Sequence, residues 1–442
     1  MFKLLVSLTV LFWAVGAVAL PYTVRYNPYG LVQWVATPER CLGQTHYHMG
    51  SGSGQSLSAV AELTNFDNAG YCAIPWGGFS ACVASTGTEW DNLGQPDPDP
   101  GKSFDTVFPL EVPWSSLLQT APTLPGSFTN LKIYIPGVEQ TGYLNDTTTD
   151  TPHMWSYGLE DYIASTGCSN CGPTTGGQAN TVDACRPSAS VPLSHRYTTA
   201  QQKLDVIQAN GGLAQLAHMS IDTFENVQLI EIYSNFYDQA DTAAGTTARQ
   251  DAAQAAWDTY NDNAGGGVWG VATNDFFLGP IPEWIGLGGL CAPNCGGANN
   301  YGAADLDRGK IEVLLPVVTW ADFDAAFRAG AFVAVVEKDT PKGGFPELIG
   351  TQMSGTAITL VTTAGVGETV TWITNGGATA GTGYTLDLTA ITPNTLTWVR
   401  AEIDDGSGKV TFTQPFTLSP VGAVTKATAK QSTGGLSEGQ KG

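Results

Sequence analysis

The residues of this chain whose type and spacing could do chemistry begin with two histidines. Histidine is scarce, with 5 in 442 residues, and His46 and His48 stand two positions apart in Thr45-His46-Tyr47-His48. On a β-strand, residues i and i+2 project from the same face, so these imidazoles point together. Two imidazoles at the end of an early strand can chelate one transition metal ion. The alternative is an exposed histidine pair that arose by chance.

Further candidate residues stand where predicted strands end. His218 closes a buried strand expected at residues 213–217, and Asp275 follows a strand expected at 267–272. Glu89 lies in the segment Gly87-Thr88-Glu89-Trp90. The catalytic rim of a parallel barrel lies at the carboxyl ends of its strands, so polar residues at these ends can meet. Taken singly, each of these carboxylates would be an ordinary loop residue.

The elements that must position these residues alternate between short apolar strands and helical patterns, from Pro21 to about Val335. Repeated strand–helix units whose strands are apolar on both faces predict a parallel α/β core, here a barrel-like one. The expected helices span 57–68, 199–210, 251–262 and 320–329, and the expected strands span 71–76, 213–217, 227–233 and 267–272.

Two stretches interrupt this rhythm, at about 93–151 and 278–308, and both are expected to be insertions that decorate the ligand-facing end. After about Gly343 apolar and polar residues alternate between Gly- and Asp-rich turns. This pattern predicts a small antiparallel, β-sandwich-like domain over residues 343–419. Residues 420–442 contain no aromatic side chain and are expected to be a disordered tail.

Composition excludes two classes of protein. The chain carries 19 basic and 40 acidic residues, for a formal net charge of −21, and it has no cluster of Lys and Arg. No counterion release is therefore available to drive binding to a nucleic acid, and no nucleic-acid partner is expected. A hydrophobic content of 42%, with 12 Trp, 15 Tyr and 17 Phe, excludes a disordered acidic chain.

The first residues predict export. A basic start at residues 1–3, an apolar run at 4–16 and the small residues Ala17-Val18-Ala19 are typical of a signal peptide over residues 1–19. A signal anchor is the alternative, although the apolar run is short for a bilayer span. No later segment approaches about 20 uninterrupted apolar residues, so we expect no membrane span. The mature protein should be secreted or extracellular, or periplasmic in a bacterium.

The chain has eight cysteines, and an even number in an exported protein predicts disulfides. Cys168-Ser-Asn-Cys171 resembles half of a zinc ribbon, but the matching second Cys-x-x-Cys is absent. Cys291 and Cys295 lie in a Gly/Pro/Asn-rich loop, where a local bridge is expected. We therefore interpret all eight as structural.

Several segments also match, in order, the motifs of a known family. They are His46-x-His48 with Gly54, Gly70-Tyr71, Gly87-x-Glu89-Trp90, 211–218, 230–235, Trp257-Asp258, 268–275 and 325–332. This series resembles the PHP (polymerase and histidinol phosphatase) superfamily of metal-dependent phosphoesterases, in its carbaryl-hydrolase-like branch, over most of residues 40–420. The resemblance implies a PHP-like distorted parallel (β/α) barrel over residues 20–342, followed by the β domain.

The resemblance also implies a set of metal ligands. It assigns His46, His48, Glu89 and Asp275 to a first metal site, and Glu89 would bridge to a second site that includes His218. One or two divalent ions, most simply Zn or Mn, would suit these imidazole and carboxylate ligands.

The chain departs from the family motifs at a few positions. Phe79 and Phe277 stand where the family has two histidines of a third metal site, so we expect that pocket to be filled by apolar side chains. Ser53 replaces an aspartate, and Met219 replaces the proline that follows the strand-end histidine. The family histidine that follows the Gly-x-Glu-Trp glutamate has no evident match.

The implied function is a secreted metal-dependent hydrolase, most simply a phosphoesterase that uses a metal-activated water. Glu89 and His218 would be its catalytic residues, and a small-molecule ester would be its substrate. The alternative is a catalytically degenerate PHP-like secreted protein that binds a carbohydrate-like ligand or has a structural role. A serine hydrolase is not supported, because the chain has no Gly-x-Ser-x-Gly elbow.

Overall fold

The computed structural model describes thirteen ranges of the chain, and the statements below refer to them. They are residues 22–32, 38–46, 59–76, 128–140, 153–157, 164–165, 196–220, 223–235, 248–274, 308–337, 345–363, 367–392 and 395–420. The signal-peptide prediction for residues 1–19 lies outside these ranges. The tail prediction for residues 420–442 also lies outside them, apart from Pro420, which is the last residue of a strand.

The helices lie where the sequence predicts them, with ends that differ by a few residues. They are α1 (Ala59–Asn68), α6 (Ala200–Ala209), α8 (Ala248–Ala264) and α9 (Trp320–Arg328). Two of them begin at a threonine cap: the hydroxyl of Thr199 accepts from the amide of Gln202 at 3.1 Å, and Thr319 accepts from Asp322 at 3.1 Å. These bonds satisfy amides that a helix cannot pair at its own start.

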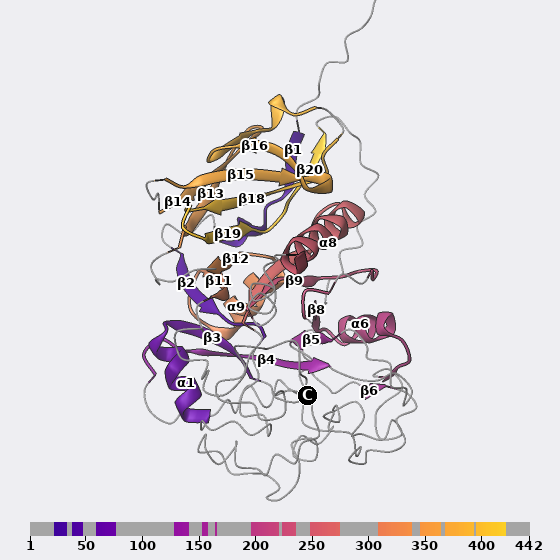
Figure 1. Cartoon of the computed structure of the whole chain (residues 1–442), viewed down its shortest axis with the longest axis vertical. Helices are drawn as coiled ribbons and strands as arrows, with labels where there is room; N and C mark the ends of the chain where they lie inside the picture. The colour runs from indigo at the N-terminus through magenta and orange to yellow at the C-terminus, as the bar shows by residue number, and fades with distance from the viewer. Residues whose placement is uncertain are drawn as a thin grey trace, which may run out of the picture.

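One large sheet runs through the molecule (Figure 1). Its main path follows the order β1-β20-β18-β19-β12-β11-β2-β3-β4-β5-β8-β9-β10, with β15 and β16 beside β18. The strands of its lower half are β2 (Glu39–Gly43), β3 (Tyr71–Trp76), β4 (Ile133–Gln140), β5 (Met154–Tyr157), β8 (Leu213–Leu216), β9 (Leu229–Ser234), β10 (Trp269–Thr273), β11 (Gly309–Leu315) and β12 (Phe332–Glu337). A two-stranded sheet pairs β6 (Ala164–Ser165) with β7 (Arg196–Tyr197).

The lower half of this sheet and its helices have the α/β content that the sequence predicts, but the strands are mixed in direction and not all parallel. Strands β2, β3 and β4 are parallel, as are β8, β9 and β10. Strand β5, however, is antiparallel to both β4 and β8, and β11 is antiparallel to β2. An antiparallel neighbour needs no helical crossover, and the connection from β4 to β5 spans only residues 141–153.

Strands β10 and β11 approach each other at one end without forming a ladder in the described part of the chain. The amide of Gly309 donates to Oδ1 of Asn274 at 3.1 Å. A Cβ atom at position 309 would lie 2.1 Å from the carbonyl oxygen of Thr273, so this approach requires glycine. The sheet therefore curls until its last strand, β10, touches β11 in the middle of the strand order, but a closed barrel is not established.

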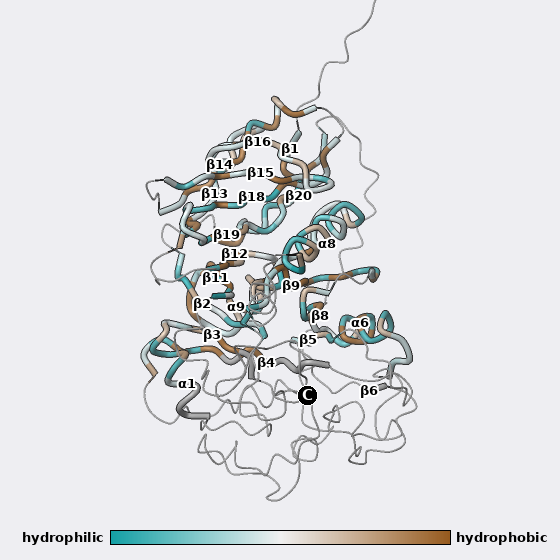
Figure 2. The backbone as a smooth tube through the Cα atoms, in the orientation of Figure 1, coloured by the Kyte–Doolittle hydropathy of each residue, from teal (hydrophilic) through white to brown (hydrophobic). Residues whose placement is uncertain are grey.

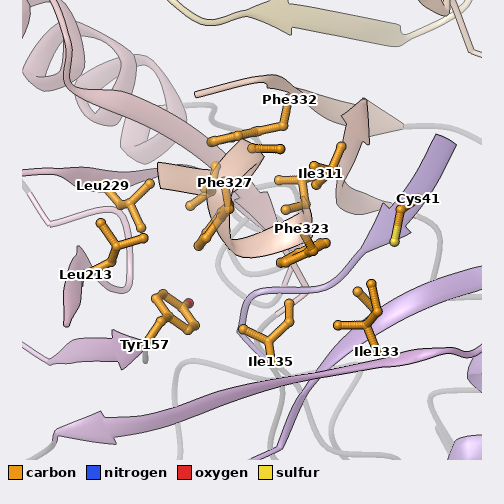
Figure 3. Packing of buried hydrophobic residues seen from close by; sticks show 14 of the residues in the cluster. Cys41, Ile133, Ile135, Tyr157, Leu213, Leu229, Ile311, Phe323, Phe327 and Phe332 are labelled. Atoms are coloured by element: carbon orange, nitrogen blue, oxygen red, sulfur yellow. The ribbon is translucent and has the colours of Figure 1, made fainter. Parts of the chain in front are cut away.

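Apolar side chains fill the inside of the curl. One buried cluster takes residues from β2, β3, β4, β5, β8, β9, β10, β11 and β12. Figure 3 shows Phe323 and Phe327 of α9 between Leu213 and Leu229 on one side and Ile133 and Ile135 on the other. Figure 2 shows hydrophobic residues, in brown, on strands such as β3 and β9, and hydrophilic residues, in teal, along much of α8. Helix α9 therefore closes one end of the curled sheet.

The C-terminal strands are antiparallel, as the sequence predicts. A small sheet of β13 (Leu348–Ser354), β14 (Ala357–Thr362) and β17 (Thr385–Asp387) shares an apolar cluster with strands of the large sheet. The C-terminal strands of the large sheet are β15 (Thr369–Thr374), β16 (Ala378–Thr382), β18 (Trp398–Asp404), β19 (Lys409–Thr413) and β20 (Phe416–Pro420).

Backbone pairing crosses the domain boundary expected near residue 343. Strand β12 pairs with β19, and the first strand, β1 (Tyr22–Tyr26), pairs with β20. The indigo β1 lies beside the yellow β20 at the top of Figure 1. Strand β4 likewise belongs to the sheet, although it falls within the insertion expected at 93–151. Independent folding of residues 20–342 and 343–419 thus stays a prediction.

A disulfide joins Cys41 of β2 to Cys72 of the neighbouring β3, with Cα atoms 5.1 Å apart. The other six cysteines, at 82, 168, 171, 185, 291 and 295, lie outside the described residues. Within the described part of the chain, no helix is both long and apolar enough to cross a membrane.

Candidate functional site

The candidate site lies at one edge of the curled sheet, where several strands end or begin. His46 follows β2, His218 follows β8 and Asn274 follows β10. His153 precedes β5, and the antiparallel direction of β5 brings this first residue to the same edge, since Met154 pairs with Leu216. The sheet thus gathers side chains from four separate segments, as expected for the carboxyl ends of parallel strands.

His46 is fully buried, and its ring is held by a carboxylate. Its Nδ1 atom lies 2.5 Å from Oε1 of Glu231, in the middle of β9. The carboxylate also accepts from Nε2 of Gln215 at 2.8 Å and from the backbone amide of His218 at 2.6 Å. Because Glu231 acts as an acceptor throughout, the proton of His46 belongs on Nδ1, and Nε2 carries the lone pair. A metal-ligating histidine is commonly oriented in this way.

The ring of His218 stacks on that of His46, with centroids 5.3 Å apart and an interplanar angle of 18°. His218 and Met219 both have left-handed backbones, with φ of 60° and 51°. They are the central residues of a turn that is closed by a 3.2 Å bond from the amide of Ser220 to the carbonyl of Ala217. Left-handed backbone outside glycine is uncommon and is found at sites where the surroundings enforce it.

His153 is a third histidine at this edge. Its ring centroid lies 4.4 Å from that of His218, and its carbonyl accepts from the amide of Ala217 at 3.1 Å. Trp155, two residues further along β5, packs against the ring of His46 with centroids 5.2 Å apart. Trp155 therefore covers one side of the His46 ring.

A buried polar network supports the site from below. The hydroxyl of Tyr157 donates to Oε1 of Gln215 at 2.7 Å and contacts the carbonyl of Thr45. Gln215 in turn donates to Glu231. Each of these side chains is buried, and buried polar groups hold their positions when their hydrogen bonds are satisfied.

A second network ties the end of β2 to the end of β10. The side-chain oxygen of Gln44 accepts from the amide of Asn274 at 3.1 Å, and its Nε2 donates to the carbonyl of Gly309 at 2.9 Å. Residue 274 immediately precedes Asp275, and Gln44 stands two positions before His46. A hydrogen bond therefore links the residue before Asp275 to the segment that carries His46.

The structure brings together two of the five predicted site residues, His46 and His218. The other three, His48, Glu89 and Asp275, lie outside the described residues, as do Phe79 and Phe277. Within the described ranges, no group of three or more His, Cys, Asp or Glu side chains is arranged to hold a metal ion. The described imidazoles fit Zn or Mn by their chemistry, as part of a ligand set that further residues must complete.

Sequence reasoning missed His153 and the role of Glu231. His153 directly precedes four buried strand residues, whereas His218 stood out because it follows the end of a strand. Glu231 is an acidic residue in an apolar strand whose every residue is buried, and a buried carboxylate in such a strand must have donors nearby.

Comparisons with known proteins give structural neighbours only. No family model matches the chain, and no curated protein sequence matches it. A two-domain protein from Bacteroides vulgatus that contains a predicted PHP-like metal-dependent phosphoesterase is similar in structure, with 10% identity and a TM-score of 0.32. That similarity covers 89% of this chain and 98% of the neighbour. PsfC from Pseudomonas syringae is similar with 10% identity and a TM-score of 0.31, over 65% of this chain and 88% of its own.

Proposed function

We propose that this chain is a metal-dependent hydrolase, most simply a phosphoesterase, whose metal ligands include His46 and His218, with His153 beside them. The observation that carries the proposal is the convergence of three of the five histidines at one sheet edge, with the Nδ1 atom of His46 fixed by Glu231. His48, Glu89 and Asp275 are proposed as the further ligands.

When bound, a divalent ion would supply the chemistry of the reaction, by activating a water and polarising the ester. The residues of the chain have separate tasks. His46 presents Nε2, because Glu231 holds its other nitrogen. His218 stands against both other imidazoles and is placed to act as a ligand or to transfer a proton. Trp155 covers one side of His46.

The experiment that tests the proposal combines metal analysis with a hydrolysis screen on the purified protein. We expect at least one tightly held divalent ion per chain, and hydrolysis of p-nitrophenyl phosphate, a phosphodiester, or a carboxyl or carbamate ester. His46→Ala and His218→Ala should lose metal and activity. His195→Ala is the matched control, since His195 is the histidine to which no site role is assigned.

A protein without metal and without hydrolysis, but with retained folding, would overturn the proposal. That result would favour the alternative of a degenerate PHP-like scaffold that binds a ligand or has a structural role.

We further propose that the protein is exported. The residue pattern at 1–19 and the bridge between Cys41 and Cys72 both support this proposal, because disulfides persist in oxidising compartments. Sequencing the N-terminus of the exported protein should find a start near Leu20. A start at Met1, or retention of the chain in the cytoplasm, would contradict it.

A further inference from the structure

We propose that Glu231 is a positioning residue that orients His46 and His218 together, one through its ring and the other through its main chain. Oε1 of Glu231 lies 2.5 Å from Nδ1 of His46, and Oε2 lies 2.6 Å from the amide nitrogen of His218. One side chain therefore controls two imidazoles that come from strand ends 172 positions apart in the chain (218 − 46). The inference rests on the proposed function, since it assigns a task to these two imidazoles.

The location of Glu231 makes this control rigid. The side chain is fully buried, and β9 is a central strand that pairs in parallel with both β8 and β10. Gln215 of β8 donates a further hydrogen bond to the same oxygen that contacts His46. A side chain locked by packing and by neighbouring hydrogen bonds can hold a functional geometry more tightly than a loop residue can.

The backbone at His218 shows why an anchor is needed there. His218 and Met219 both have positive φ, the pattern of a type I′ turn, which favours Asn-Gly. Left-handed backbone at residues other than glycine costs on the order of 1–3 kcal/mol each. A charge-assisted bond from the amide of His218 to Glu231 offsets part of that cost. The carboxylate thus selects the turn that directs the ring of His218 onto that of His46.

Met219 belongs to the same turn as His218. Proline is restricted to φ near −65°, so it could not adopt the φ of 51° observed at position 219. The replacement of the motif proline by methionine is therefore required by this turn. In this chain the direction of the His218 ring depends on the turn and on the carboxylate that anchors it.

For His46 the carboxylate determines which nitrogen carries the proton. An acceptor at Nδ1 places the proton there and leaves the lone pair on Nε2. Glutamine is nearly the same size as glutamate, but its amide nitrogen would face either the Nδ1 proton of His46 or the amide proton of His218. Glu231→Gln therefore sets a donor against a donor at one of the two histidines, while it preserves volume.

The matched control is Glu312→Gln. Glu312 is also a buried glutamate of the same sheet, on β11, but its carboxylate contacts Arg40. We would label the histidines with ¹⁵N and read the ring tautomers by NMR in the metal-free wild type and both variants. Zn²⁺ affinity would be measured by competition with a chromophoric chelator.

We expect Nδ1-protonated His46 in the wild type and in Glu312→Gln. In Glu231→Gln the tautomer signals of His46 should change, or the chemical shifts of His218 should move. Zn²⁺ should bind about 10–100-fold more weakly to Glu231→Gln, as is typical when the partner of a metal ligand is removed. Glu231→Asp, which keeps the charge but is shorter, should recover part of the loss.

The outcomes separate this inference from the proposed function. A wild type that binds no Zn²⁺ contradicts the proposed function, while the tautomer measurement still decides the role of Glu231. A wild type that binds Zn²⁺ as tightly as a folded Glu231→Gln contradicts the inference alone. If Glu231→Gln does not fold, the wild-type spectrum decides: an Nε2-protonated, neutral His46 would overturn the inference.

Discussion

A buried glutamate from another strand contacts the chain near each end of β2, and the two glutamates differ in their hydrogen-bond partners. At the carboxyl end of β2, beyond Gln44, His46 meets Glu231, which accepts from three donors on its two oxygens. Near its amino end, Arg40 donates to Oε1 of Glu312 at 2.9 Å, while the buried Oε2 has no hydrogen-bond partner among the described residues. Both glutamates lie within the sheet, on β9 and β11.

The difference shows that burial alone does not make a carboxylate useful for positioning. Burial raises the pKa of Glu312 to about 7, and the nearby Glu347 carboxylate adds to this, although the Arg40 guanidinium lowers it. Such a group can lose its charge near neutral pH. Glu231 instead has a donor for each oxygen, and those donors belong to the site. A comparison of Glu231 with Glu312 therefore tests whether the hydrogen-bond donors around a carboxylate, and not its burial alone, make it a positioning residue.

The largest effect is expected from Glu231→Ala. This change removes the acceptor for His46, Gln215 and the amide of His218, and it leaves a cavity. Removing one partner from a buried charged network destabilises a protein by about 3–5 kcal/mol. The free energy of unfolding, measured with urea, should fall by that amount. If Glu231→Ala lowered the free energy of unfolding no more than Glu312→Ala does, the proposed difference between the two glutamates would be wrong.

Removing the disulfide that joins β2 to β3 is expected to have the next largest effect. Cys41 lies in β2 between Arg40 and Gln44, and its disulfide to Cys72 closes a loop with a sequence separation of 31. Chain entropy predicts a stabilisation of about 3–4 kcal/mol for a loop of this length. The double variant Cys41→Ala/Cys72→Ala should lower the midpoint of thermal unfolding accordingly, whereas an unchanged midpoint would show that the bridge is dispensable.

The third prediction concerns pH at the Glu312 end. Because the folded pKa, about 7, exceeds the ordinary value for glutamate, the folded state binds the proton more tightly than the unfolded state. The stability that this tighter proton binding adds is therefore fully present below about pH 4.3. It is lost as pH rises toward 7, and the free energy of unfolding then falls by on the order of 3 kcal/mol. Glu312→Gln should remove this slope from the urea midpoint measured against pH. An unchanged slope would show that Glu312 titrates normally.

The smallest effect is expected from Tyr157→Phe. The hydroxyl donates a hydrogen bond to Gln215, and Gln215 donates one to Glu231. Loss of the hydroxyl therefore affects the site only indirectly. Loss of a buried hydrogen bond typically costs about 1–2 kcal/mol. Tyr384→Phe is a control, because its hydroxyl bonds to Glu368 far along the chain from the site. Equal losses of stability with unchanged Zn²⁺ affinity in both variants would place Tyr157 outside the site network.

The elements of the fold were readable from the sequence where the pattern is local. Strand β3 has the bounds that its apolar run predicted, and α6 and α9 begin at the threonine caps next to their expected starts. The antiparallel placement of β5 and the pairing of β1 with β20 were not readable. Alternation of side chains reports which face is buried, but it does not report which distant strand lies alongside.

Local sequence patterns likewise predicted only part of the candidate site. His46 and His218 stood out because each ends a strand, and the structure stacks their rings. Glu231 did not stand out, because its task depends on hydrogen bonds to β8 and to the residue after β2, which no local pattern encodes. His153 was missed because it precedes its strand, and only the reversed direction of β5 brings it to the site.

The pairing of β1 with β20 has a consequence for the order in which the chain can fold. The hydroxyl of Thr23 bonds to the carbonyl of Ser419, across a sequence separation of 396. During synthesis the first strand therefore has no ladder partner until almost the whole chain has left the ribosome. Closing so long a loop is slow, because its entropy is lost before the contacts are gained. Completion of the large sheet is thus expected late in folding, after both of these strands have been synthesised.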